Sequence, residues 1–317
     1  MNNLALYLIS VLVWGSTWFA IEFQLGLVEP EVSIVYRYVG ASLLLFGWSF
    51  YRRLNLSFGL REHGWFLLMG MFLFGLNYVL AYRAQIYITS ALTAIAFSSI
   101  LWMNILNARL FFGTRAGART IIGSLLGVAG IVTLFAPQVQ DVSLSDTVLL
   151  GSMLAILGAL AASFGNMVSQ GAQKRGLPVV QSNAWGMFYG ALLSAISSVI
   201  AGHPFNFDPS PGYVISLAYL TVFGSVIAFG AYLTLLGRIG AHKAGYAMVM
   251  FPVVALILSI LFEGLKLDLP IIAGTALVLV GNIFVLETRS KGHNGRDGEP
   301  RRHNSPQSRP EIASREP

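Results

Sequence analysis

Long apolar stretches alternate along the chain with short polar connections. An apolar helix of about 20 residues, rising 1.5 Å per residue, crosses a hydrocarbon core of roughly 30 Å. Ten runs of about this length span residues 4–21, 32–50, 64–82, 88–112, 120–136, 147–171, 181–201, 213–236, 243–262 and 270–287. The connections are rich in turn-forming and charged residues, and none has the length of a soluble domain. The pattern predicts an all-α integral membrane protein with ten transmembrane helices.

The amino-acid composition agrees with this prediction. Of the 317 residues, 55% are hydrophobic and 11% are charged, whereas a soluble domain holds roughly 25% charged residues. The sequence has no cysteine, which excludes disulfides, thiolate metal sites and cysteine nucleophiles. It also has neither a Gly-rich phosphate-binding loop with Lys nor a His-Glu-x-x-His motif. We therefore expect no enzymatic activity and no cofactor.

Positive charge is concentrated at the C-terminal end. The formal net charge is +6, and seven of the twenty Lys and Arg residues follow residue 288. Residues 289–317 consist largely of Gly, Pro, Ser, Arg and Glu, so we expect a disordered basic tail. The charge therefore belongs largely to this tail and does not indicate a nucleic-acid partner.

The remaining Lys and Arg residues indicate an orientation. With the N-terminus inside, the cytoplasmic connections hold Arg52, Arg53, Arg61, Arg115, Arg119, Lys174, Arg175, Arg238 and Lys243. The opposite connections are mainly acidic, with Arg83 and Lys266 as the basic exceptions. Because basic residues favour the cytoplasmic side, both termini are predicted to be cytoplasmic, in a multi-pass protein of the cell inner (plasma) membrane.

Residues repeat along the chain at a spacing of 150 to 151. Matching pairs include Gly15 and Gly165, Gly40 and Gly190, Ala81-Tyr82 and Ala231-Tyr232, Gly123 and Gly274, and Gly130 and Gly281. We infer two five-helix repeats, over residues 1–137 and 138–288. Because five is odd, the second repeat enters the membrane in the opposite sense. Inverted repeats of this kind support alternating access around a central site.

Several motifs resemble those of EamA-type proteins in the drug/metabolite transporter superfamily. They are Trp14-Gly15-Ser16-Thr17-Trp18 in the first predicted helix, Arg37-Tyr38 in the second, and Phe251-Pro252-Val253-Val254-Ala255 leading to Glu263-Gly264 in the ninth. The similarity covers about residues 4–287. In the first half, Leu101-Trp102 and Phe112-Gly113-Thr114 depart from the family's Pro and Gly-Glu pattern. The resemblance implies the fold and a transport function, but not a particular substrate.

Few ionisable residues lie inside the predicted helices. Arg37 is near the outer end of the second helix, where it can pair with Glu22 or Glu31 or attract an anionic group of a substrate. Arg109 is expected to extend to the cytoplasmic surface. No Asp or Glu falls at mid-membrane, which disfavours a proton-coupled antiporter that uses a buried acid.

Aromatic and neutral polar residues fill the predicted centre of the membrane. Such residues suit a small organic solute with an apolar body. The predicted substrate-binding residues are Trp14, Ser16, Thr17, Arg37, Asn77, Tyr78, Tyr82, Ser99, Trp102, Asn166, Tyr232, Tyr246 and Phe251. Other roles stay open for some: Tyr82 and Tyr232 fit an interfacial aromatic belt, and Ser99 and Asn166 fit hydrogen bonds between helices.

The sequence thus predicts a secondary transporter that exports a small organic metabolite, such as an amino acid, through a central aromatic cavity. Its partners would be this substrate and membrane lipid, with the chain acting as a monomer or homodimer. Two alternatives remain: multidrug efflux, and a non-transporting scaffold or receptor that uses the basic tail.

Overall fold

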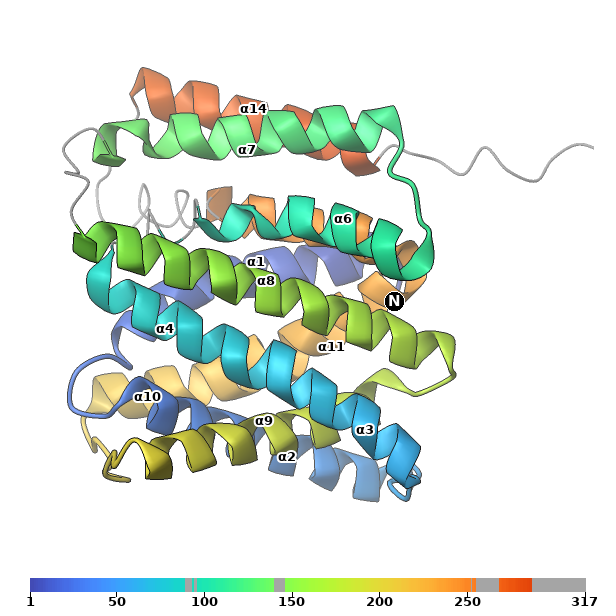
Figure 1. Cartoon of the computed structure of the whole chain (residues 1–317), viewed down its shortest axis with the longest axis vertical. Coiled ribbons are helices and arrows are strands. Elements are labelled where there is room, and N and C mark those ends of the chain that lie inside the picture. The colour runs from blue at the N-terminus through green and yellow to red at the C-terminus, as the bar shows by residue number, and fades with distance from the viewer. Residues whose placement is uncertain (89–92, 94–95, 140–145, 252, 255–267, 287–317) are drawn as a thin grey trace, which may run out of the picture.

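The computed structural model describes residues 1–88, 93, 96–139, 146–251, 253–254 and 268–286. The predicted tail of residues 289–317 lies outside this part of the chain. Secondary structure in the described residues is helical throughout. The long helices lie side by side across the view of Figure 1, from α7 and α14 at one edge to α2 and α9 at the other.

The chain passes first through the helices α1 (Asn3–Glu22), α2 (Pro30–Tyr51), α3 (Leu60–Met69), η1 (Gly70–Leu76), α4 (Asn77–Tyr87), α6 (Ile100–Phe112) and α7 (Ala118–Val139). It continues through α8 (Asp146–Lys174), α9 (Val179–Ile200), α10 (Pro211–Tyr219), η2 (Leu220–Ile227), α11 (Ala228–Ile239), α12 (Ala241–Ala244), η3 (Gly245–Met250) and α14 (Leu269–Leu286). The segments η1 and η2 are π-helical, and η3 is a 3₁₀-helix.

Six helical segments within the described residues are long and apolar enough to cross a membrane. They are α1, α2, the continuous segment Leu60–Tyr87, α8, α9 and the continuous segment Pro211–Ile239. Two shorter apolar helices, Ala118–Leu134 and Leu269–Val285, match further predicted spans. The two remaining predictions, 88–112 and 243–262, fall partly outside the described residues. At the start of the first span, Ile88 follows the end of α4 and has an extended backbone. The described part of the second span includes the 3₁₀-segment η3.

Local sequence explains where the helices begin and end. The side chain of Asn2 accepts a hydrogen bond from the backbone N–H of Ala5 at 2.8 Å and so caps α1. Pro30 and Pro211 open α2 and α10, at positions where the missing N–H would have no helical partner. Gly113 ends α6 with a φ of 65°, a left-handed conformation that glycine adopts without strain.

The two π-helical segments occupy equivalent places in the chain. They begin at Gly70 and Leu220, which are 150 residues apart, and each interrupts a long membrane-spanning segment. A π-turn adds a residue to the α-helical turn and so redirects the side chains that follow it. In η2, the hydroxyl of Ser225 donates to the carbonyl of Leu220 at 3.0 Å. Such segments are frequent at functional sites.

Helices that the repeat makes equivalent also pack against each other. The closest neighbours in the bundle include α7 with α14 and α2 with α9. An added Cβ at Gly274 would meet the backbone N of Leu134 at 2.6 Å, and one at Gly130 would meet the carbonyl of Gly274 at 2.7 Å. Glycine is therefore required for this close approach. Close contacts between glycines thus join α7 to α14.

The largest buried cluster connects α1, α2, η1, α9 and α11. A second cluster joins α7 and α14 to η3. Figure 1 shows α7 and α14 as a separate outer layer beside the bundle formed by the other helices. The cavity that forms the candidate site lies within this main bundle, and none of its described lining residues belongs to α7 or α14.

Candidate functional site

A cavity of about 80 Å³ lies between the helices of the main bundle. Residues from both halves of the chain line it: Trp14, Thr17, Ile21, Arg37, Leu73, Asn77, Tyr78, Ala81, Tyr82, Gln85, Phe97, Ile100, Ala162, Phe229, Tyr232, Met248 and Phe251. This volume has room for a few water molecules only, whereas pockets for drug-sized ligands begin at roughly 300 Å³. A larger ligand therefore requires the helices to move apart.

Trp14 is the centre of the aromatic wall. Its ring centroid lies 4.8 Å from that of Phe229, 5.0 Å from that of Tyr232 and 5.6 Å from that of Phe251. Its indole N–H donates to the carbonyl of Gly224, in η2, at 2.9 Å. The π-helical segment thus provides the acceptor that fixes this ring. The wall joins α1 of the first half to α11 and to Phe251, which directly follows η3, in the second.

Arg37 brings a buried positive charge to the cavity. The residue is 1% exposed, and its Nε donates to the hydroxyl of Ser225 at 2.8 Å. The guanidinium carbon lies 4.8 Å from the ring centroid of Tyr78 and 5.4 Å from that of Tyr38. Its Nη1 is buried and has no hydrogen-bond partner. Aromatic faces and a hydroxyl therefore hold this cation and leave a donor free.

The two outward ion pairs considered for Arg37 are not formed. Glu31 is paired with Arg83 instead, and Glu22 is exposed. No described carboxylate lies within ion-pair distance of Arg37. An added Cβ at Gly224 would lie 3.2 Å from Nη2 of Arg37 and 3.1 Å from the side chain of Thr17, so these side chains would have to shift. Gly224 thus leaves room for the guanidinium, and the neighbouring Ser225 binds it.

Other polar atoms around the cavity also lack partners. The amide oxygen of Asn77 is buried without a hydrogen bond, and Gln85, which also lines the cavity, has a buried amide nitrogen without one. The amide nitrogen of Asn77 makes a long bond of 3.4 Å to the carbonyl of Leu73. Buried polar groups are normally satisfied, so these atoms are positioned to meet a ligand or water.

Most of the predicted binding residues line this cavity: Trp14, Thr17, Arg37, Asn77, Tyr78, Tyr82, Tyr232 and Phe251. Tyr82 is 1% exposed and Tyr232 is fully buried, so neither belongs to an interfacial belt. Their role in binding a substrate stays a prediction. Arg109, expected at the surface, is exposed in the last turn of α6.

The other predicted residues lie elsewhere. Ser16 contacts the hydroxyl of Tyr219 at 2.6 Å, and Ser99 donates to the carbonyl of Ala96 at 2.6 Å. Asn166 donates to the amide oxygen of Asn104 at 3.3 Å, across α8 and α6. Trp102 is partly exposed on α6 and does not line the cavity.

Tyr246 also differs from its predicted role. Its hydroxyl donates to the carbonyls of Gly123, at 3.1 Å, and Val278, at 3.3 Å. The residue therefore joins η3 to α7 and α14 and is not part of the cavity lining.

Phe229 is the main cavity residue that was not predicted from the sequence. It contacts Trp14 and Phe74, the latter with ring centroids 4.9 Å apart. Phe229 and Tyr232 stand three residues apart in α11, a spacing that places both on one face of the helix. This spacing, applied from Tyr232, would have found it.

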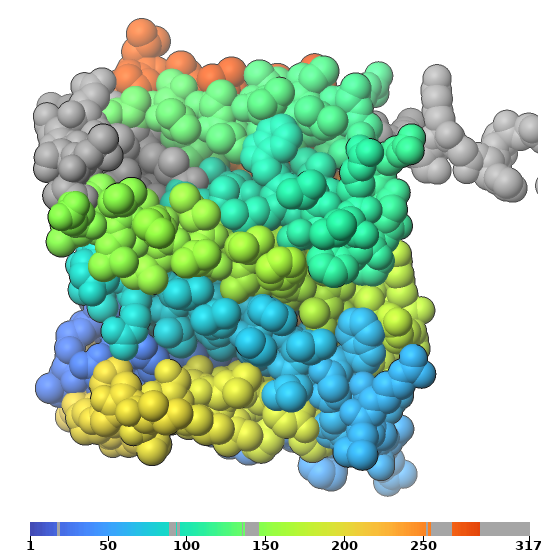
Figure 2. All heavy atoms as spheres, in the orientation of Figure 1, coloured from blue at the N-terminus to red at the C-terminus, as the bar shows by residue number. Residues whose placement is uncertain are grey.

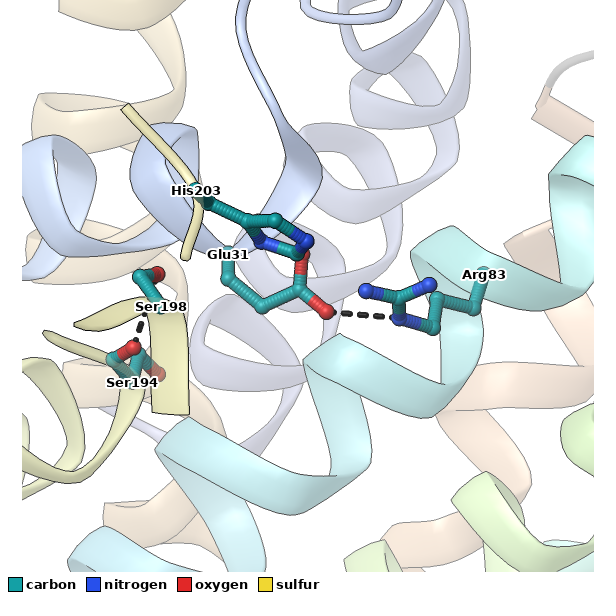
Figure 3. A network of polar contacts seen from close by, with 5 residues as sticks. All are labelled: Glu31, Arg83, Ser194, Ser198 and His203. Carbon is teal, nitrogen blue, oxygen red and sulfur yellow. Dashed lines mark hydrogen bonds and ion pairs between the residues drawn. The ribbon is translucent and has the colours of Figure 1, made fainter. Parts of the chain in front are cut away.

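A second polar network lies near the N-terminal end of α2 (Figure 3). Glu31 is 2% exposed, and one of its carboxylate oxygens accepts a hydrogen bond from Nε of Arg83 at 2.6 Å. The other oxygen lies 3.7 Å from Nδ1 of His203. The hydroxyl of Ser198 donates nearby to the carbonyl of Ser194 at 3.0 Å. The network thus connects α2 and α4 to the segment that follows α9.

Replacing Glu31 with Gln should lower the melting temperature by roughly 2–8 °C. The substitution leaves the guanidinium of Arg83 without its counter-ion, although the 38% exposure of the Arg83 side chain lets water offset part of the loss. Thermal unfolding of the purified protein measures the effect. Glu22→Gln, at an exposed position, removes the same charge and should leave the melting temperature unchanged. Equal melting temperatures for Glu31→Gln and wild type would contradict a stabilising role.

The fold and the cavity together define a class: a multi-pass helical membrane protein with a polar and aromatic cavity between its helices. Residues 2–136 and 149–287 each match the EamA-like transporter family, and the chain belongs to that family. Both halves of the chain thus match the same family domain, which agrees with an internal duplication.

Two relatives illustrate the similarity. The uncharacterized transporter YoaV of Bacillus subtilis (strain 168) is 23% identical over 91% of this chain and 99% of its own length. The uncharacterized inner membrane transporter YedA of Escherichia coli (strain K12) is 27% identical over 78% of each chain. A crystal structure with 17% sequence identity superposes with a TM-score of 0.74, over 89% of this chain and 95% of the other. That likeness supports the fold alone.

Proposed function

We propose that this protein is a secondary transporter for a small organic metabolite with a carboxylate and an apolar body, such as an apolar amino acid. The observation that carries the proposal is Arg37, a buried cation in the cavity without a carboxylate partner. Burying a charge is costly unless a counter-charge or hydrogen bonds compensate it. A substrate carboxylate would accept from the free Nη1 of Arg37.

The remaining lining suits the rest of such a substrate. The unpartnered amide oxygen of Asn77 is an acceptor for an ammonium group. Trp14, Phe229 and Phe251 offer apolar surface to the side chain of the substrate. A positive charge in the cavity would also repel the toxic cations that many efflux transporters carry, so multidrug efflux is the weaker alternative.

Transport would proceed by alternating access. We infer that the two halves are inverted five-helix repeats, residues 1–137 and 138–288, and that their relative movement opens the cavity to each side in turn. The π-segments at equivalent places and the packing of α2 on α9 and α7 on α14 support this duplication. A cavity of about 80 Å³ corresponds to a compact state between the two openings.

The Lys and Arg residues of the connections support an orientation in which both termini are cytoplasmic and the protein lies in the cell inner membrane. Export is the proposed direction. Under this orientation the network of Glu31, Arg83 and His203 lies on the outer side, where it links elements of both halves and closes the outer end of the bundle.

Transport by purified protein in liposomes tests the proposal. Liposomes loaded with labelled phenylalanine, leucine or methionine should release at least one of them in a saturable way, faster than protein-free liposomes. The matching amino-acid methyl esters, which lack the carboxylate, should compete at least tenfold less well. Release of cationic drugs without release of any carboxylate would overturn the proposal and favour efflux. No release of either class would favour the scaffold alternative.

A further inference from the structure

A groove of about 500 Å³ runs between α3, α6 and α8, apart from the central cavity. Its lining includes Trp65, Phe72, Phe112 and Phe164, and Arg175 is its only charged residue. Phe111, another lining residue, is 55% exposed. Figure 2 shows α3, α8 and α6 on the surface that faces the viewer. In a membrane-spanning bundle this surface faces lipid.

A second space of about 300 Å³ continues the groove at the basic end of the bundle. It is lined by Arg61, Glu62, Trp65, Arg175 and Leu177, so the two spaces share Trp65 and Arg175. The Arg175 guanidinium carbon lies 4.4 Å from the ring centroid of Trp65. Lys174 Nζ lies 4.1 Å from the ring centroid of Phe112. Aromatic rings thus hold two cations at the mouth of an apolar groove.

The cations at this mouth have no anionic partner in the described part of the chain. Both ion pairs among the described residues involve Glu31, far from this mouth in the sequence, and neither involves Arg61, Lys174 or Arg175. Nη1 of Arg175 donates only to the backbone carbonyl of Gly171, at 3.2 Å. With Glu62 as the one acid lining the mouth, the three cations leave an excess of positive charge.

The spacing of the groove residues gives its length. Arg61, Trp65, Leu68 and Phe72 follow one another at intervals of four, three and four residues. Phe164, Val168, Gly171 and Arg175 repeat these intervals on α8. Each series spans 12 residues, or 11 steps of about 1.5 Å, which gives a length of about 16 Å. This matches half of a hydrocarbon core of roughly 30 Å, the depth of one leaflet.

We propose that this groove is a binding site for an anionic phospholipid. Its phosphate lies between Arg61 and Arg175, with Lys174 beside it, and an acyl chain lies along the aromatic groove. Basic pockets between membrane helices bind such headgroups, and the apolar groove gives a lipid an advantage over free phosphate. α3 and α8 continue directly into residues of the central cavity, Leu73 and Ala162, so the lipid would brace the walls of that cavity.

Native mass spectrometry of the purified full-length protein tests this site. Phosphatidylglycerol should form adducts at lower concentration than phosphatidylcholine with the same acyl chains. The double variant Arg61→Gln/Arg175→Gln should weaken phosphatidylglycerol binding about 30-fold, roughly fivefold for each lost cation. The double variant Arg52→Gln/Arg53→Gln, which removes the same charge elsewhere at the basic end, should leave binding unchanged.

Three results would overturn the proposal. The first is equal binding of phosphatidylglycerol and phosphatidylcholine by the wild-type protein. This comparison needs no variant, so it does not depend on whether the substituted protein folds. Equal losses in the two double variants would show attraction by overall charge and not by a site. Binding of glycerol 3-phosphate as tight as that of phosphatidylglycerol would show a site for soluble anions. Because all three are binding measurements, their outcome is independent of whether the protein transports amino acids.

Discussion

Replacing Arg37 with Gln should reduce the affinity for a carboxylate substrate by at least 100-fold. Hydrogen bonds to charged groups contribute about 1.5–3 kcal/mol each, and Arg37 combines a charge with a free donor in a buried site. Uptake of labelled substrate into liposomes, measured over a range of concentrations, would show the loss. The substituted protein should remain folded, because replacing a buried charge with a neutral group removes a desolvation cost.

Two matched comparisons separate the charge of Arg37 from its shape. Arg37→Lys keeps the charge but loses the planar fork, so we expect an intermediate loss of affinity. A methyl ester of the same substrate lacks the carboxylate and keeps only its ammonium charge, so it should bind the Arg37→Gln variant at least as well as it binds the wild-type protein. Wild-type affinity for the carboxylate in Arg37→Gln would contradict this role.

Replacing Gly274 with Leu should prevent stable packing of α14 on α7. An added Cβ would meet the backbone of Leu134 and Gly130 at 2.6 and 2.7 Å, and backbone atoms cannot rotate away as a side chain can. Overpacking of this kind costs about 1–3 kcal/mol for a small group and more for a larger one. We expect Gly274→Ala to lower the melting temperature by roughly 2–12 °C and Gly274→Leu to abolish a monodisperse folded protein.

Gly47 provides the control for this prediction. It also lies within a long apolar helix, α2, but an added Cβ there would meet nothing within 4 Å. Gly47→Ala and Gly47→Leu should therefore leave the melting temperature unchanged or raise it, because glycine is a poor helix former. Fluorescence-detected size exclusion and thermal unfolding compare the four variants. A Gly274→Leu variant as stable as Gly47→Leu would show that close approach is not required.

Hydropathy located most of the membrane-spanning segments because crossing a hydrocarbon core demands a long apolar run. The same signal does not distinguish hydrogen-bonding patterns within a run. The π-segments η1 and η2 and the 3₁₀-segment η3 were therefore not predicted, although Asn77 and Phe229, which follow η1 and η2, and Met248 in η3 line the cavity. Residue spacing alone shows neither an added residue in a turn nor the bends it produces.

Residue type predicted much of the cavity lining, but the direction of each side chain decided the exceptions. Ser99 donates to a carbonyl three residues before it in the chain, and Ser16 does the same as well as contacting Tyr219. Tyr246 points to the glycine-rich contact of α7 and α14. Glu31 stands at the edge of an apolar run, where exposure to water is expected, but the fold buries it against Arg83. These outcomes depend on contacts between distant segments.

Single-cysteine accessibility tests most directly whether the central cavity opens to both sides of the membrane. The chain has no cysteine, so Ala81→Cys would place the only thiol in the cavity lining. We expect a membrane-impermeant thiol reagent to label Ala81→Cys from either side, and we expect substrate to slow both reactions. Ala155→Cys, fully buried away from the cavity, should stay unlabelled. Labelling of Ala81→Cys from one side only, or from neither, would contradict alternating access through this cavity.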